Sequence, residues 1–335
     1  MSVAVQMPPG GPAITSASGL IAMLEEEQLD IKAYALTKLN AVVDDFWAEI
    51  ADCLPDIEAL YEDDAFKSRE LAALVASKVY FQLGELDDAL TYALGAGSLF
   101  DVSSTGSEYV DTLLAKCIDE YCQQHVRASE GKPPKPTDDG AEDASGSPAD
   151  IDARLVEIVE RMFDACFARE QYKQALGIAL EARRLDVIYR ALTRERLQVG
   201  AGCTFAEVES AAAAAAVAGM AVPDASLTPA MLEHCLEACK STITSREFRT
   251  HVLRLLVTIF RRLPAPDYLG LCECLTRLGD VEAVAATLSK LADGSDREFL
   301  LACQVAFDLV ENGSQSFVAK VAARVDPPPP PPPAA

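Results

Sequence analysis

Glu170-Gln-Tyr-Lys-Gln-Ala-Leu-Gly-Ile-Ala-Leu-Glu-Ala-Arg-Arg-Leu-Asp-Val187 is the stretch that decides the fold of this chain. It resembles an earlier stretch, Glu85-Leu-Asp-Asp-Ala-Leu-Thr-Tyr-Ala-Leu-Gly-Ala-Gly-Ser-Leu-Phe-Asp-Val102. A shift of 86 positions places Ala89, Leu90, Ala93, Leu94, Ala96 and Leu99 on Ala175, Leu176, Ala179, Leu180, Ala182 and Leu185. Small and large apolar residues at this helical spacing predict a helix that packs closely on two sides, because alanine permits near approach and leucine fills the groove beside it.

Each copy follows another apolar helix across a short turn, so the repeated unit is a helical hairpin. The turn Leu83-Gly84-Glu85 is echoed by Leu278-Gly279-Asp280, which indicates a third copy. Repeated helical hairpins are typical of solenoids, which work as scaffolds or binding surfaces. No alternating β pattern of useful length is present. The sequence therefore predicts an all-α fold, a solenoid-like array of antiparallel helical hairpins.

Composition divides the chain into helical and low-complexity parts. Segments rich in Pro, Gly, Ser and Asp bury too little apolar surface to offset the entropy of ordering. Residues 198–228 contain a six-alanine run that favours helix locally but is interrupted by glycine and proline. The predicted organisation is: 1–13 disordered; 14–127 a first helical array; 128–150 a disordered acidic linker; 151–326 a second helical array with a low-complexity insertion at about 198–228; and 327–335 a polyproline tail.

The charge balance excludes several classes of partner. The formal net charge is −23 and the isoelectric point is near 4.5. Nucleic acids and anionic membrane surfaces need clustered Lys and Arg, so we expect neither as a partner. The longest run without a polar side chain, Ala211 to Val222, is well short of the roughly 20 residues that span a bilayer. No secretory signal is present at the start, so the sequence predicts a soluble intracellular protein.

The residues that could carry chemistry do not form a recognisable active site. Ten cysteines in a chain of 335 residues indicate buried thiols in a reducing compartment, not a disulfide framework. A zinc site built from His234, Cys235, Cys239, Cys272 and Cys274 lacks a turn with closely spaced ligands. Nothing orients His125 as the base of a Cys122 nucleophile. We therefore expect no catalytic residue, no metal and no cofactor.

One basic feature contrasts with the acidic background. Five arginines lie within fourteen residues beside the second copy of the repeat: Arg183, Arg184, Arg190, Arg194 and Arg196, here called the arginine cluster. One interpretation is a solvated helix face on which these arginines pair with nearby carboxylates, Glu195 among them. The other is a partner surface, because the planar guanidinium binds carboxylates in a bidentate manner.

Several strings resemble one family, in order along the chain. They are Lys38-Leu-Asn-Ala-Val-Val-Asp-Asp-Phe-Trp-Ala-Glu-Ile50, Leu60-Tyr-Glu-Asp-Asp64, Leu71-Ala-Ala-Leu-Val-Ala-Ser-Lys-Val79, Tyr92-Ala-Leu-Gly-Ala-Gly97, the stretch from Tyr172 to Val187, and Val252-Leu-Arg-Leu-Leu-Val257. They are similar to the N-terminal region of 26S proteasome non-ATPase regulatory subunit 1. Family members continue into a ring of proteasome/cyclosome repeats and a C-terminal extension that recruits a ubiquitin receptor. Neither part has a counterpart here, so the resemblance covers an N-terminal rod. The alanine-rich insertion at about 198–228 is foreign to the family pattern, so the resemblance implies a surface loop there.

The resemblance implies a non-catalytic scaffold in the base of the proteasome regulatory particle. Its expected role is to support assembly and ubiquitin-dependent protein degradation, with other regulatory-particle subunits as partners and the cytoplasm and nucleus as location. Two alternatives stay open: a generic helical-repeat adaptor of another complex, or a thiol or zinc enzyme that uses His234, Cys235 and Cys239.

Overall fold

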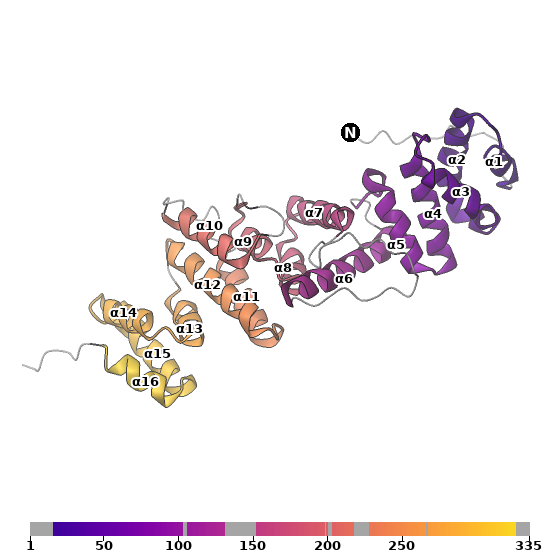
Figure 1. The fold of residues 1–335 in the computed structure, drawn as a ribbon. Coiled ribbons are helices and arrows are strands. Elements are labelled where there is room, and N and C mark those ends of the chain that lie inside the picture. The colour runs from indigo at the N-terminus through magenta and orange to yellow at the C-terminus, as the bar shows by residue number, and fades with distance from the viewer. Residues whose placement is uncertain are drawn as a thin grey trace, which may run out of the picture. The chain divides into compact units, whose positions relative to one another are not determined.

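The computed structural model describes residues 16–102, 106–130, 152–197, 199, 203–217, 228–265 and 267–325 (Figure 1). In these ranges it contains sixteen α-helices, one short 3-10 helix and no strand. The all-α prediction is confirmed. Among the described helices, none combines the length and apolar character that crossing a lipid bilayer requires.

The chain divides into two compact units, residues 1–165 and 166–335. The boundary falls inside helix α7, close to its C-terminal end. The helices of the first unit are α1 (Ser18–Ala22), α2 (Leu29–Ala51), α3 (Leu54–Glu62), α4 (Arg69–Leu83), α5 (Leu86–Gly95), η1 (Gly97–Leu99), α6 (Glu108–Glu130) and most of α7 (Ala153–Ala168).

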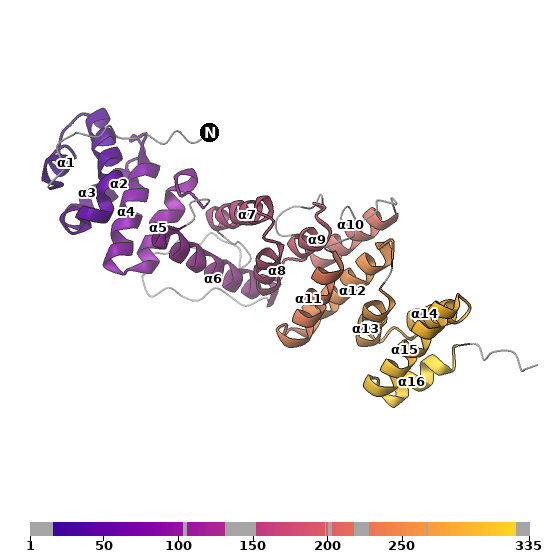
Figure 2. The same cartoon turned by 180° about the vertical axis from the view of Figure 1, so that it is seen from behind.

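The core of the first unit lies between α2, α3 and α4, which are neighbours in both views (Figures 1 and 2). Helix α4 is apolar around most of its circumference because it lies between α2 and α3 on one side and α5 on the other. Its one fully buried polar side chain, Ser77, donates a hydrogen bond of 2.6 Å to the carbonyl of Ala89 on α5. This bond links α4 to α5 and satisfies the buried Ser77 hydroxyl, which apolar packing alone would leave without a hydrogen bond.

Helix α2 is kinked in its second half, where Phe46 has a non-helical backbone (φ −123°, ψ 20°). The sequence predicts a break at this point, because Asp44 and Asp45 favour a helix start. The chain re-enters the helix directly after Phe46, so the break is a kink of one residue and not a loop between two helices. Phe46 and Trp47 are half-buried at the kink, and both pack against the core of the first unit.

The second unit starts at the end of α7 and consists of successive hairpins. Its helices are α8 (Tyr172–Glu181), α9 (Leu185–Thr193), α10 (Phe205–Val217), α11 (Thr228–Ser241), α12 (Arg246–Arg262), α13 (Tyr268–Leu278), α14 (Val281–Ala292), α15 (Asp296–Asn312) and α16 (Gln315–Ala322). Helix α12 is the central element, with α9, α10, α11 and α13 packed around it. Gly270 on α13 allows close approach, because a Cβ atom there would lie 2.8 Å from the ring of Phe260.

The two copies of the repeat adopt the same structure as far as the end of their first helix. Helices α5 and α8 and the residues that end them bury the same alanine positions completely: Ala89, Ala93 and Ala96 in one, Ala175, Ala179 and Ala182 in the other. The copies then diverge. Leu185 is buried as the first residue of α9, whereas its counterpart Leu99 ends η1 and is 43% exposed.

The turn before each repeat helix is built in the same way in three places. Gly84 has a left-handed backbone (φ 85°), as does Gly279 (φ 74°). The equivalent residue in the second copy is Glu170, with φ 60°. At each turn this residue and the next donate their N–H groups to carbonyls three and five positions earlier, which is the Schellman arrangement. The third copy inferred from Leu278-Gly279-Asp280 therefore closes its hairpin by the same hydrogen bonds.

The alanine-rich segment is not the surface loop that the sequence predicts. Residues 205–217 form α10, which packs against α12 and buries Val208 and Ala212. Its Glu209 carboxylate lies 2.7 Å from Nδ1 of His251 on α12. The prediction failed because it followed the family pattern, to which this segment is foreign, and not the helical propensity of the alanine run.

Other predicted segments fall wholly or largely outside the described residues. These are the disordered start at 1–13, most of the linker at 128–150, the two ends of the 198–228 insertion, and the polyproline tail at 327–335.

The left-handed turns give a matched pair of stability changes. We expect Gly84→Ala to lower the free energy of unfolding by about 1 kcal/mol, since a Cβ atom disfavours the left-handed region. Glu170→Gly should raise it by about 1 kcal/mol at the equivalent position. Both sites are exposed, and a Cβ atom at Gly84 meets no atom within 4 Å, so packing contributes little. Urea denaturation followed by circular dichroism measures both.

Gly177 provides the control, because it lies inside α8 with an ordinary helical φ and open space around its missing Cβ. Gly177→Ala should stabilise the protein by roughly 0.5–1 kcal/mol through helix propensity. If Gly84→Ala stabilised the protein as Gly177→Ala does, the left-handed turn would not constrain the hairpin.

Candidate functional site

The arginine cluster lies along α9 and in the connections at its two ends. Its members differ in burial. Arg184 is only 5% exposed, and its guanidinium donates two hydrogen bonds, of 2.8 and 2.7 Å, to the carboxylate of Asp186. This buried bidentate pair holds the start of α9 in place, so Arg184 supports the surface without being part of it.

Two further arginines lie over aromatic rings. The guanidinium of Arg190 lies 4.1 Å from the ring centre of Phe167, and that of Arg194 lies 4.7 Å from the ring centre of Tyr172. The two rings are themselves 6.0 Å apart. Stacking on a ring fixes the plane of a guanidinium and therefore the directions of its N–H groups. All four side chains are half-buried, so the arrangement reaches the surface.

The remaining two arginines, Arg183 and Arg196, lie in the connections that follow α8 and α9. Arg183 follows α8 in the left-handed conformation (φ 55°), at the position that Gly97 occupies in the first copy. Arg196 lies beyond α9 and is exposed. The structure therefore places four of the five arginines at the surface of one hairpin and buries the fifth, Arg184.

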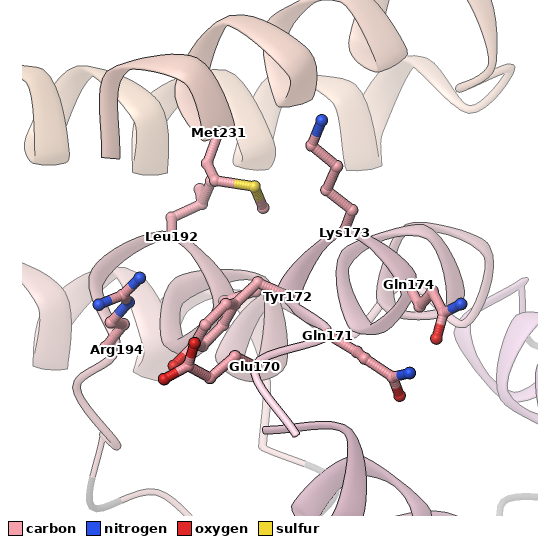
Figure 3. A pocket seen from close by; sticks show the side chains of 9 residues that line it. Glu170, Gln171, Tyr172, Lys173, Gln174, Leu192, Arg194 and Met231 are labelled. Carbon is pink, nitrogen blue, oxygen red and sulfur yellow. The ribbon is translucent and has the colours of Figure 1, made fainter. Parts of the chain in front are cut away.

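An open pocket of about 350 Å³ adjoins this surface. Figure 3 shows Met231 reaching down from α11 and Lys173 extending beside it, with Tyr172, Glu170 and Arg194 on the other side. The rest of the lining is formed by Ala191, Leu192, Gln171 and Gln174.

A buried polar network, which sequence reasoning missed, fixes α9 against α12. Arg262 on α12 donates to both carboxylate oxygens of Glu195, at 3.2 and 3.0 Å, and to the hydroxyl of Tyr189. The same hydroxyl donates to Glu195 at 2.7 Å. The Arg262 side chain is 4% exposed. Local spacing groups Glu195 with the arginine cluster, but the carboxylate binds an arginine 67 positions away, which no local spacing reveals.

The cysteines considered for zinc lie in the core. Cys235 and Cys239 are on α11, Cys272 and Cys274 are on α13, and all four are buried. Within the described part of the chain, no group of three or more His, Cys, Asp or Glu side chains is arranged to hold a metal ion. His234, by contrast, is exposed at the surface of α11. His234 is therefore at the surface, whereas the four thiols that the zinc hypothesis grouped with it are in the core.

Burial contributes to a raised thiol pKa at three of these cysteines, Cys235, Cys272 and Cys274. It raises the pKa of Cys272 to about 12. A hydrogen bond with the Cys239 thiol, together with burial, raises the pKa of Cys235 well above its ordinary value. A protonated, inaccessible thiol is a poor nucleophile and a poor metal ligand.

Thiol accessibility can be counted directly. Six cysteines are buried, namely Cys53, Cys117, Cys235, Cys239, Cys272 and Cys274, and the other four are half-buried. At pH 8 we expect Ellman's reagent to react with four thiols or fewer in the native protein and with all ten after denaturation. Fast labelling of Cys235 or Cys239 in the folded protein, located by mass spectrometry, would instead revive the thiol-enzyme alternative.

The Arg262 network makes a second prediction. Arg262→Ala leaves the Glu195 carboxylate half-buried without its cation, and should lower the free energy of unfolding by about 3–5 kcal/mol. Arg277→Ala serves as the control. Its side chain is 43% exposed and pairs with Glu273 one turn away, so its loss should cost less than about 1 kcal/mol. Equal costs for the two variants in urea denaturation would show that the buried network does not stabilise this unit.

Comparison with known proteins identifies the family. The family model described as the N-terminal domain of 26S proteasome subunit RPN2 matches residues 15–328. The chain is 42% identical over 317 residues to 26S proteasome non-ATPase regulatory subunit 1 homolog A of Arabidopsis thaliana, which covers 94% of this chain and 27% of the relative.

Relatives from other organisms agree. Identity to 26S proteasome non-ATPase regulatory subunit 1 of Drosophila melanogaster is 40% over 310 residues, which is 92% of this chain and 26% of the relative. Identity to 26S proteasome regulatory subunit rpn2 of Schizosaccharomyces pombe is 36% over 310 residues, again 92% of this chain and 27% of the relative. The chain thus spans about a quarter of the length of the relatives it matches. Because the family model covers nearly the whole sequence, the chain belongs to the family of the N-terminal domain of 26S proteasome subunit RPN2.

Proposed function

We propose that this chain is a non-catalytic scaffold of the proteasome regulatory particle, within its base, and that it supports assembly and ubiquitin-dependent protein degradation. The observation that carries the proposal is the family match over residues 15–328, on a fold made of repeated helical hairpins. Such arrays present long surfaces on which other proteins dock. As a member of that particle, the chain would work in the cytoplasm and nucleus.

The partners under this proposal are other regulatory-particle subunits, and the docking surface is formed by Arg183, Arg190, Arg194 and Arg196. The charge of the whole chain is −23, so long-range attraction of an acidic partner is weak and the attraction has to be local. Two of these guanidiniums are already oriented by stacking on Phe167 and Tyr172. An oriented side chain loses less entropy on binding than a flexible one, which favours bidentate docking of an acidic segment.

A thiol or zinc enzyme fits the described residues less well. Cys235 and Cys239 are buried, a hydrogen bond and burial raise the pKa of Cys235, and His234 is exposed. A generic helical-repeat adaptor makes the same surfaces but leaves the family match unexplained.

Charge reversal tests the docking surface. We expect Arg190→Glu, Arg194→Glu and Arg196→Glu together to reduce co-purification of other regulatory-particle subunits at least about tenfold, because three favourable charges become unfavourable. Arg184 is left intact, since reversing a buried paired charge would unfold the region. The measurement is quantitative mass spectrometry of proteins recovered with the tagged full chain at low and high salt. Wild-type recovery should fall as salt rises.

The control carries the same charge change elsewhere in the second unit: Arg277→Glu, Arg297→Glu and Arg324→Glu, all at exposed positions. Circular dichroism establishes that both triple variants are folded. Equal recovery from the two variants would rule out the arginine cluster as the docking surface, and absence of proteasomal subunits from the wild-type sample would overturn the scaffold proposal itself.

A further inference from the structure

Helix α15 is apolar on two separate faces. One face carries Ala302, Val305 and Leu309, which are buried against the neighbouring helices α13, α14 and α16. The other is here called the α15 stripe and consists of Phe299, Leu300, Phe307 and Val310, whose exposed fractions are 51%, 67%, 75% and 68%. Both ribbon views show α14, α15 and α16 beside one another (Figures 1 and 2).

The four residues of the stripe share one side of the helix. At about 100° per residue, the stripe fills one sector of the helix surface about 100° wide. Phe299 and Val310 lie within about 20° of each other at one edge of this sector. Leu300 and Phe307 lie within about 20° of each other at the other edge. The half-buried Cys303 lies in the middle of that sector. The stripe is therefore continuous along most of the length of α15.

Exposed large apolar residues are otherwise scattered in the described part of the chain. Nine are exposed in all, and four of these are on this single helix of seventeen residues. Isolated exposed apolar residues are ordinary, whereas a contiguous stripe marks a contact surface. A helix that is apolar on two sides is typical of a position between two neighbours, as α12 has between α10 and α13. The buried face of α15 packs against α13, α14 and α16, whereas the stripe is exposed.

The charges around the stripe indicate which occupant fits. Asp296 at the start of α15 and Glu311 at its end are exposed and border the stripe. The other exposed charges of α15 are Asp308 and Arg297, so carboxylates outnumber cations on this helix. A second copy packed antiparallel would place Asp296 against Glu311, and a parallel one would place like residues together. Either arrangement sets carboxylates against carboxylates in a chain of net charge −23. A helix with Lys or Arg along the borders of its apolar face complements the same charges.

The relatives indicate where such a helix comes from. This chain matches only 26–27% of their length, and the matching family model is an N-terminal domain, so most of each relative's polypeptide follows the matched part. Helix α15 is the last long helix before the match ends at residue 328. We propose that the α15 stripe binds an amphipathic α-helix with basic borders, from the polypeptide that follows the matched part in these relatives.

The test uses the full chain and synthetic peptides of known sequence. Overlapping peptides of about 25 residues, enough for about seven helical turns, cover the part of the Arabidopsis homolog A that follows the match. Binding of each peptide to the wild-type chain is measured by fluorescence anisotropy. We expect the tightest peptides to be amphipathic helices whose apolar face is bordered by Lys or Arg. Phe307→Asp should weaken their binding at least about 30-fold, as loss of a central aromatic contact does.

Tyr34→Asp is the matched control, because Tyr34 is an aromatic residue of α2 that is 55% exposed in the other unit. It should leave peptide binding unchanged, and neither variant should alter the circular dichroism spectrum. The proposal is overturned if no peptide depends on Phe307, or if the peptides that depend on it have acidic borders. Light scattering that shows a dimer abolished by Phe307→Asp would assign the stripe to a second copy and overturn it as well. These outcomes are independent of the arginine cluster, so failure here leaves the docking test above unaffected.

Discussion

The repeated hairpins of this protein depend on a single residue that leaves the helix in the left-handed conformation. At Gly84, Glu170 and Gly279 this residue directs the chain back on itself, and the hydrogen bonds of the Schellman arrangement satisfy carbonyls that the helix end would otherwise leave open. Because the turn is short, the next helix has to pack directly on the previous one. Alanine at the contact positions then follows from the geometry, since a larger side chain would hold the helices apart.

The hairpin is a constant frame on which the connections vary. In the first unit the repeat helix is followed by a 3-10 turn from Gly97, and the carbonyls of Gly97 and Phe100 accept hydrogen bonds from Arg161 on α7. In the second unit the residue equivalent to Gly97 is Arg183, and the chain goes on into the helix α9. The two copies therefore differ in the connection that follows the repeat helix, and in the second copy the arginine cluster begins in this connection.

Periodicity predicted the parts of the fold that are local. The alanine spacing of the repeat helices α5 and α8 and the turn at Gly279 both follow from spacing within one or two helices, and both are as expected. Contacts between distant residues have no such signal. The pairing of Arg262 with Glu195 joins positions 67 apart, and the burial of Arg184 depends on how α9 packs, not on its own sequence. The arginine cluster was thus found as a set of residues, but its division into a buried support and a surface patch required the structure.

The fully buried alanines also set limits on how this sequence can drift. Ala89, Ala93 and Ala96 have no exposed surface, and neither do Ala175, Ala179 and Ala182. Valine at any of these positions adds volume where a neighbouring helix already lies, at a cost of typically about 1–3 kcal/mol. Between them, the helix surfaces that face water accept substitution with little effect. Divergent members of such a family would therefore differ widely in composition and charge while keeping the same few small residues in register, a pattern that overall percent identity understates.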